Sequence, residues 1–525
     1  MTSEIVPPSA TAIGLFTGLV LYFIGGALYR LYFSPLARFP GPKIAAITFW
    51  YGFYYDAICK GQYIWKIEQM HAKYGPVVRI NPDEIHVNDP NFYSVLYAGA
   101  RENREKVFKN TRQFGMPDSI LFSVPQKLHR MRRAILNPFF SKASVYKLEP
   151  VIQDKVDQML ERMQQFRVSR QPIPLFEMFA AYSNDVVMEY AFARSDRRLA
   201  QPDFDPVLLN ALVSASEMAH WMLHFNWVFR ILQSLPLWLA KKLNPGLHRG
   251  WTTVSPVFLL TLTQRIKDHI RAIQNGTNKS NEKTDGSHRT IFHDVLEADI
   301  PASEKRLERM WQEGMIVVGA GTDTTAWTLV VAMVYIILNP PIRQRLEAEL
   351  KAATTEKGGL QLSDLEQLPY LSACIKESLR LGYGLAARLP RVAPDQVLEV
   401  PGTSGLAIQP GTKVMMSSVL MHRHPSVFPQ PDRFDPNRWL ENPRLDNYLV
   451  TFSKGARSCL GINLAYAEIY MALAGVFGQF PLGDDEGPRL ELLKGADTLK
   501  DVTIAGDMFL PAVLSGQKHI EAVFK

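Results

Sequence analysis

Two stretches of this sequence are apolar over enough residues to cross a membrane as a helix. Residues 10–29 contain no charged side chain, whereas residues 315–338 carry one acid, Asp323, near their centre. A helix of about 20 apolar residues spans the hydrocarbon core of a bilayer, which is about 30 Å thick. Because a charge inside that core is costly, we predict a transmembrane helix at 10–29 and a buried core helix at 315–338.

The rest of the chain follows mostly helical periodicity. Apolar residues recur at helical spacing through most of 138–350. Short runs that are typical of strands occur near 77–87, 397–400 and 413–418. This pattern predicts a mainly α fold with small β-sheets, which is an α+β class.

Charges around the first apolar stretch set its expected orientation. Glu4 is the only charged side chain before the stretch, whereas Arg30, Arg38 and Lys43 follow it. A cleaved signal peptide would begin with a basic segment, and basic residues stay on the cytosolic side of a membrane. The expected segments are a lumenal N-terminus at 1–9, a single-pass transmembrane anchor at 10–29, a proline-rich linker at 30–45 and one cytosolic domain at 46–525.

Composition narrows the class of protein further. The chain has 525 residues, 47% of them hydrophobic, and a net charge of +7. That charge is mild for the length, and no nucleic-acid module is evident, so it fits a membrane surface or an acidic protein partner better than DNA. The three cysteines, Cys59, Cys374 and Cys459, cannot build a disulfide framework and fit a reducing compartment.

Cys459 lies in the segment most informative about chemistry. It precedes an apolar helical run at 462–474, so we expect it at a helix N-terminus with a low thiol pKa. Gly455 permits a tight turn, Gly461 permits close approach of a flat ligand, and Arg457 suits a carboxylate. A single cysteine is most often a small buried hydrophobe, but these neighbours meet the needs of a haem with an acidic rim.

The predicted core helix at 315–338 is interrupted by small and polar residues. Gly319, Gly321 and several threonines surround Asp323 and Thr324 in its middle. Polar groups inside an apolar helix are costly unless they are satisfied. We therefore expect this helix to open a pocket, where a carboxylate and a hydroxyl are available for proton delivery.

These segments together resemble the cytochrome P450 family. Phe452, with the glycines, arginine and cysteine that follow it up to Gly461, meets every fixed position of the family's signature Phe-x-x-Gly-x-Arg-x-Cys-x-Gly. The resemblance implies that Cys459 is the axial ligand of haem iron. Residues 320–325 also resemble the family motif Ala-Gly-x-Asp-Thr-Thr, which implies that Thr324, with Asp323, directs protons during cleavage of the O–O bond.

A charged pair upstream of the cysteine segment also has a counterpart in the family. Glu377 and Arg380 are three residues apart and therefore share one face of a helix. Such a pair is usually a solvated surface ion pair. In the family it joins the arginine of a Pro-x-Arg-Phe segment, here Arg433, so the resemblance implies a structural triad that supports the cysteine loop.

A basic cluster at 127–133 is the third feature with a family counterpart. Basic runs are most often solvated faces or sites for polyanions. His129 and Arg133 are spaced so that both can reach one ligand. The family commonly has Trp-x-x-x-Arg here for the haem propionates, so His129 departs from the pattern at the aromatic position. Arg391 resembles another propionate contact, whereas Arg388 resembles none.

The resemblance implies a haem-thiolate monooxygenase with the cytochrome P450 fold. Such an enzyme holds haem b and inserts one oxygen atom from O2 into an apolar molecule. Its electrons come from NADPH through a flavoprotein reductase, with cytochrome b5 as an optional second donor. Residues 39–42 resemble the proline-rich hinge of microsomal members, which implies the endoplasmic reticulum membrane, and residues 61–67 resemble fungal members of secondary metabolism, which implies hydroxylation or epoxidation of a terpenoid or similar compound.

Two other function classes stay open. A haem-thiolate isomerase or dehydratase would use no O2 and would not need Asp323 or Thr324. A non-catalytic haem-binding protein would need no reductase. The substrate itself is not readable from the sequence. By resemblance its pocket is lined by 108–124, 220–229, 319–325, 383–389 and 504–509.

Overall fold

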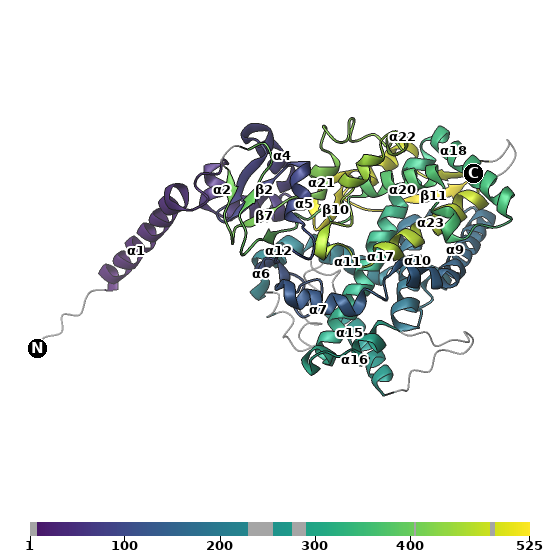
Figure 1. The fold of residues 1–525 in the computed structure, drawn as a ribbon, viewed down its shortest axis with the longest axis horizontal. Coiled ribbons are helices and arrows are strands. Elements are labelled where there is room, and N and C mark those ends of the chain that lie inside the picture. The colour runs from purple at the N-terminus through teal and green to yellow at the C-terminus, as the bar shows by residue number, and fades with distance from the viewer. Residues whose placement is uncertain (1–7, 229–230, 232–255, 276–289, 404–405, 483–488) are drawn as a thin grey trace, which may run out of the picture.

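Helices form most of the chain, as the sequence predicts (Figure 1). The computed structural model describes residues 8–228, 231, 256–275, 290–403, 406–482 and 489–525. Within these residues the strands make four small sheets. The α+β expectation is therefore confirmed.

The predicted anchor forms a helix that projects away from the rest of the molecule (Figure 1). It comprises α1, Pro8–Leu28, and a π-helical continuation η1, Tyr29–Phe33. The apolar span Ile13–Phe33 has 21 residues and none of it is buried in the protein. The helix thus runs past the predicted end at residue 29, and residues 1–7 of the predicted lumenal segment lie outside the described residues.

The predicted linker packs against the first sheet. Leu36 and Phe39 are buried in the same apolar cluster as that sheet. The Arg79 amide donates a hydrogen bond to the Pro40 carbonyl, 2.8 Å away. A Cβ at Gly41 would lie 2.3 Å from the Arg79 carbonyl oxygen, so the chain can pass this close to the strand only with glycine. The segment then enters α2, Lys43–Ile47.

The largest sheet has the strand order β1-β2-β7-β4. Its strands are β1 Val77–Asn81, β2 Glu84–Val87, β7 Lys413–Met415 and β4 Arg391–Val392. β1 and β2 form an antiparallel hairpin, and β7 adds to β2 in parallel. The remaining strands are β5 Leu398–Glu399 with β6 Ala407–Ile408, β9 Ile504–Met508 with β10 Leu510–Val513, and β3 Ile173–Pro174, β11 Glu521–Phe524 and β8 Leu490–Leu492. All three predicted strand regions therefore contain strands.

The central helix of the molecule is α17, Leu307–Ile337. It packs against α10 (Leu175–Phe192), α15 (Pro256–Gln274), α20 (Pro369–Gly382) and α23 (Ile462–Gln479), which surround it in Figure 1. Most of its apolar window, 61%, is buried inside the protein, in contrast to the N-terminal span. The prediction of a core helix at 315–338 is confirmed.

Shorter helices complete the described chain. The other α-helices are α3 Trp50–Phe53, α4 Tyr63–Tyr74, α5 Tyr93–Leu96, α6 Phe108–Thr111, α7 Gln126–Leu136, α8 Lys142–Lys147, α9 Glu149–Ser169, α11 Val207–Glu217, α12 Ala219–His224, α16 Ile291–Glu297, α18 Pro340–Lys357, α19 Leu362–Leu365, α21 Ser418–His422, α22 Asn437–Glu441 and α24 Leu499–Val502. A second π-helical segment is η2 Tyr54–Ile58. The 3₁₀-helices are η3 Pro90–Phe92, η4 Arg198–Ala200, η6 Ala302–Lys305, η7 Pro443–Tyr448, η8 Gly455–Arg457 and η9 Gly495–Thr498.

Candidate active site

Cys459 lies in a tight loop between η8 and the first turn of α23. Its amide donates a hydrogen bond to the Phe452 carbonyl, 2.9 Å away, which closes the loop. Gly455 has φ +72°, and a Cβ there would lie 2.0 Å from the Ala98 carbonyl oxygen. Both the conformation and the space therefore require glycine. At Gly461 a Cβ would meet no atom of the described residues within 4 Å, so this residue leaves open space beside the cysteine.

The Cys459 side chain is exposed to an internal cavity, so it is not a packed core cysteine. Burial raises the pKa of its thiol, and the Gly461 amide and the Arg133 guanidinium offset this only in part. The expectation of a low thiol pKa is therefore wrong for the protein by itself. A metal ion bound to the sulfur favours the thiolate, because the deprotonated form is the ligand.

The cavity has a volume of about 450 Å³ and a mostly apolar wall. Cys459 lies on its surface together with Asp323 and Thr324 from α17. Each of the five stretches expected to line the pocket contributes residues to the wall, as do α10 and α11, which were not expected. A cysteine, a carboxylate and a hydroxyl from distant parts of the sequence thus border one mostly apolar cavity.

The middle of α17 is shaped by small residues at the cavity surface. A Cβ at Gly321 would lie 2.5 Å from the Val187 side chain, so α10 can approach this closely only beside glycine. The Thr324 hydroxyl donates a hydrogen bond of 2.7 Å to the Ala320 carbonyl one turn earlier. Its lone pairs stay free for a donor in the cavity. The predicted opening of this helix toward a pocket is present.

Asp323 is almost fully buried, with 2% of its surface exposed, and neither carboxylate oxygen has a hydrogen-bond partner among the described residues. Burial raises the pKa of this carboxyl, and the nearby Lys518 ammonium opposes the shift. The Lys518 ammonium lies 4.2 Å from the centre of the Trp327 ring. Sequence reasoning missed Lys518, because nothing in its neighbourhood of the sequence connects it with α17.

Five basic side chains line the same cavity: Lys106, His129, Arg133, Arg391 and Arg457. Burial and mutual repulsion lower the pKa of His129 to about 3, so its ring is neutral, and the pKa of Lys106 is lowered by burial and by Arg391 and Arg457. In the described part of the chain none of these groups forms a salt bridge with a carboxylate. Buried cations without counterions are costly, so this end of the cavity is suited to an anionic ligand.

Two of the predicted cofactor contacts also stabilise the cysteine loop. The Arg457 guanidinium donates to the carbonyls of Arg104, Ser123 and Val124, at 3.0, 2.7 and 2.7 Å. Arg133 donates to the Ser458 carbonyl at 2.6 Å, directly before the cysteine. Both arginines line the cavity, so each joins the loop to the segment around α7 while facing the space beside Cys459.

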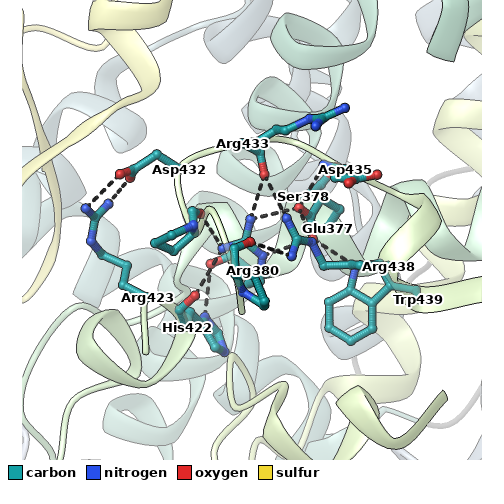
Figure 2. Close-up of polar contacts among 12 residues, drawn as sticks. Glu377, Ser378, Arg380, His422, Arg423, Asp432, Arg433, Asp435, Arg438 and Trp439 are labelled. Atoms are coloured by element: carbon teal, nitrogen blue, oxygen red, sulfur yellow. Dashed lines mark hydrogen bonds and ion pairs between the residues drawn. The ribbon is translucent and has the colours of Figure 1, made fainter. Parts of the chain in front are cut away.

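Arg380 is fully buried and uses all five of its N–H donors (Figure 2). Two go to the Glu377 carboxylate at 2.9 and 2.7 Å. The others go to the carbonyls of His422, Pro431 and Arg433, at 3.0, 2.6 and 3.0 Å. A guanidinium with every donor paired fixes the relative position of the three segments that it joins.

The predicted triad needs one correction. Arg433 is exposed, and Figure 2 shows its guanidinium turned away from Glu377 while its carbonyl faces the network. The second guanidinium on Glu377 belongs to Arg438, whose Nε donates at 3.1 Å. Trp439 Nε1 and the Asp435 amide donate to the same carboxylate, at 2.8 and 2.9 Å. Because α22 begins at Asn437, its first turn brings Arg438 back to Glu377, whereas Arg433 lies in the extended segment before it.

His422 connects this network to the cysteine loop. Its Nδ1 donates to the Arg380 carbonyl, 2.9 Å away, and its Nε2 accepts from the Val450 amide at 2.9 Å. Val450 begins the short turn that leads to Phe452, the residue that closes the loop on Cys459. The buried ion pair and the cysteine are thus joined by an unbroken chain of hydrogen bonds and backbone.

The residues of this cavity fit haem b. An accessible cysteine sulfur, open space beside Gly461 and basic side chains that have no carboxylate partner among the described residues match the iron, the flat ring and the propionates. Comparison with known families gives the same answer, because the cytochrome P450 family model matches residues 40–495. The chain belongs to the cytochrome P450 family. Bound haem supplies activation of O2, and a thiolate ligand favours O–O cleavage.

Relatives of this P450 support the same conclusion over nearly the whole chain. The cytochrome P450 monooxygenase tpcC of Cochliobolus heterostrophus is 40% identical over 97% of this chain and 96% of its own. The cytochrome P450 monooxygenase astB of Talaromyces wortmannii is 40% identical over 96% of each chain. The tryptophan 6-hydroxylase fscE of Fusarium equiseti is 39% identical over 89% of this chain and 90% of its own. This P450 is therefore an oxidoreductase that resembles monooxygenases of fungal secondary metabolism.

Proposed function

We propose that this P450 inserts one oxygen atom from O2 into an apolar small molecule, by hydroxylation or epoxidation. The observation that carries the proposal is the shared cavity, in which the Cys459 sulfur, the Thr324 hydroxyl and the Asp323 carboxylate border one apolar space. An apolar substrate gains free energy by leaving water for such a wall. Bound there, it keeps bulk water away from the reacting atoms.

Thr324 and Asp323 have distinct roles in this proposal. The Thr324 hydroxyl is fixed by its bond to the Ala320 carbonyl and can accept a hydrogen bond from a group in the cavity. Asp323 has a raised carboxyl pKa and no hydrogen-bond partner among the described residues, so it can hold a proton close to that hydroxyl. We propose that the two groups pass protons from the protein to the oxygen being reduced.

Electrons are proposed to come from NADPH through a flavoprotein reductase, with cytochrome b5 as an optional second donor. The exposed side chains of Lys127 and Arg130 on α7 support this, because they give the surface beside the cysteine loop a positive charge. Such a surface attracts an acidic partner by long-range electrostatics.

The proposed location is the endoplasmic reticulum membrane, with a single span and the catalytic domain in the cytosol. Support comes from the exposed apolar helix Ile13–Phe33 and from the basic residues that follow the predicted span, Arg30, Arg38 and Lys43. In this topology residues 1–9 are lumenal and residues 46–525 form the catalytic domain.

The proposed substrate class is a terpenoid or another secondary metabolite. The apolar cavity wall supports an apolar substrate, and the relatives support a metabolite. Two of the relatives are described as a tryptophan 6-hydroxylase and an N-acetyltryptophan 6-hydroxylase, so hydroxylation of an aromatic metabolite belongs to the same proposal.

A carbon monoxide difference spectrum of the reduced microsomal protein tests the haem-thiolate assignment. We expect a strongly red-shifted Soret band that is lost in Cys459→Ala.

NADPH consumption measured beside product formation then separates the three function classes. In a monooxygenase, Thr324→Ala keeps much of the NADPH consumption but loses product. An isomerase would form product without NADPH, and a non-catalytic protein would form none.

A further inference from the structure

A second, smaller cavity adjoins the one that contains Cys459. Its volume is about 110 Å³, and Phe122, Leu385 and Phe509 are among the residues that line both cavities. Like the larger cavity, it is bordered by several ionisable side chains. Four of them meet at one place: Asp56 from η2, His220 from α12, Arg388 from the segment after α20, and Asp507 from β9. We call these four residues the acidic cluster.

Arg388 lies between the two carboxylates of the acidic cluster. Its Nη2 is 2.6 Å from an Asp56 oxygen, and its Nε is 3.4 Å from an Asp507 oxygen. His220 Nε2 lies 2.6 Å from the Asp507 carbonyl oxygen, so it carries the proton and donates there. The same nitrogen is 3.8 Å from a carboxylate oxygen of each aspartate, which is too far for a hydrogen bond.

The polar groups of the acidic cluster are only partly paired. Asp56, His220 and Asp507 are buried, with 5%, 4% and 0% of their surface exposed. Asp56 Oδ1 and His220 Nδ1 have no hydrogen-bond partner among the described residues, and Asp507 Oδ2 has only the 3.4 Å contact with Arg388 Nε. Two carboxylates share one guanidinium, and burial raises the pKa of the Asp507 carboxyl, so the protein alone stabilises the second negative charge poorly. A buried charge of this kind is costly unless a ligand neutralises it.

The other ionisable groups on this cavity do not supply that neutralisation. Glu84 accepts a hydrogen bond from the Asn81 side chain, and its charge attracts Lys109. Lys106 and Arg391 also line the haem cavity and belong with its basic side chains; Lys106 donates to the Leu121 carbonyl and Arg391 to the Pro390 carbonyl. His224 is neutral, because burial lowers its pKa to about 4. The described residues therefore leave the open acceptors of the acidic cluster without a donor.

A divalent metal ion is a poor match for this site, although ligand atoms of Asp56, His220 and Asp507 lie within 4.8 Å of one another. Arg388 stays positively charged and already pairs with both carboxylates. A divalent ion would leave the cluster with an excess positive charge. A single positive charge balances it, and an ammonium group also supplies the N–H donors that the open acceptors need.

We propose that the acidic cluster binds the protonated amine of the substrate. The substrate of this P450 is then an apolar molecule with one amino group, which lies in the smaller cavity while the carbon to be oxidised lies in the larger one. This inference rests on the proposed monooxygenase function and narrows its substrate class. It assigns Asp56 and Asp507 as specificity-determining residues that take no part in the oxygen chemistry.

The test compares phenylalkylamines of graded chain length with alkylbenzenes of the same length. Binding is followed by the optical spin-state shift of the ferric haem. We expect one chain length at which the wild type binds the amine about tenfold more tightly than the hydrocarbon and gives the high-spin shift, because the amine is held away from iron. Asp56→Asn should lower affinity for the amine about tenfold and leave affinity for the hydrocarbon unchanged.

Glu84→Gln is the matched control, because Glu84 lines the same cavity and already has a partner. It should keep the preference for amines. A second measurement needs no variant: N-acetylation of the amine removes its charge and should abolish the preference. The proposal is overturned if the wild type shows no preference for the amine, if Asp56→Asn keeps it, or if the amine gives a nitrogen-ligated low-spin spectrum.

Failure of the inference and failure of the proposed function give different results. If the carbon monoxide spectrum is red-shifted and alkylbenzenes still shift the spin state, the haem-thiolate cavity is intact, and loss of amine preference rejects the acidic cluster alone. If the carbon monoxide band is absent from folded protein, the proposed function fails first.

Discussion

Two buried charged regions of this P450 differ in how completely the protein satisfies them. Around Glu377 every carboxylate oxygen and every N–H of Arg380 has a partner, and none is left for a ligand (Figure 2). Around the cavity, by contrast, neither oxygen of Asp323 has a hydrogen-bond partner among the described residues, and in that part of the chain Lys106, Arg391 and Arg457 form no salt bridge with a carboxylate.

This difference in pairing distinguishes polar groups that stabilise the fold from polar groups that bind a ligand. A buried polar group costs free energy unless it is bonded, so a protein keeps an unpaired one only where another molecule completes it. The network of Arg380 makes the backbone around the cysteine loop rigid. The unpaired groups of the cavity are left to haem and substrate, and the acidic cluster follows the same rule in the smaller cavity.

The largest expected effect comes from removing Glu377. Glu377→Ala leaves the Arg380 guanidinium buried with no counterion, so the free energy of unfolding should fall by about 3–5 kcal/mol. Urea denaturation followed by circular dichroism measures it. Glu399→Ala, on an exposed position of β5, should change the free energy by less than about 0.5 kcal/mol. An equally small effect at Glu377 would contradict a structural role for the network.

For Asp323→Asn we expect little change in stability but a large loss of activity. The substitution removes a carboxyl whose charged form burial disfavours, but it also removes the attraction to Lys518, so the free energy of unfolding should change by less than about 1 kcal/mol. Product formation should fall about 100-fold, because the amide cannot exchange a proton as the carboxyl does. Turnover and urea denaturation on the same preparation measure both. A large loss of stability would place Asp323 among the structural groups instead.

Substitutions of Arg438 and Arg433 test which arginine side chain completes the network around Glu377. Arg438→Ala removes a charged donor from the buried Glu377 carboxylate and should lower the free energy of unfolding by about 1.5–3 kcal/mol. Arg433→Ala removes an exposed side chain and keeps the carbonyl that Arg380 uses, so its effect should stay within about 0.5 kcal/mol. Thermal melting of the two variants side by side shows which one loses more stability. A larger loss in Arg433→Ala would support the triad predicted from the sequence.

His422 gives the network a pH dependence. Burial and the Arg380 charge lower its pKa from 6.5 to about 3. Between these values the unfolded chain binds a proton that the folded chain does not, so stability is full above pH 6.5 and falls as pH decreases toward 3. At pH 5 the loss from His422 should be about 2 kcal/mol. Urea midpoints at pH 7 and pH 5 measure it; His422→Gln should reduce the difference, whereas His519→Gln, at an exposed histidine, should not.

The features that could be predicted from the sequence depend on patterns among neighbouring residues. The mainly α fold, the core helix at 315–338 and the cysteine loop depend on residues close together in the chain, where helical periodicity and required glycines leave few alternatives. Asp323, Thr324, His129, Arg133 and Arg391 were also expected, and the structure places all five on the cavity.

Two predictions were wrong, and both concern side chains whose surroundings depend on long-range packing. Arg433 was chosen from its place in a motif, but the first turn of α22 directs Arg438 to Glu377 instead. The thiol of Cys459 was expected to have a low pKa from its place before a helix, yet desolvation by the surrounding protein outweighs that contribution.

By itself, therefore, the sequence determined the family, the helical framework, the anchor candidate and the cysteine that can hold haem. Only the tertiary structure decided that Lys518 faces Asp323, that Lys106 joins the basic side chains of the cavity, and that Asp56 meets Asp507. Periodicity and capping act over a few residues and are readable along the chain. Desolvation and charge pairing depend on which segments come together in space, and that depends on the packing of the whole core.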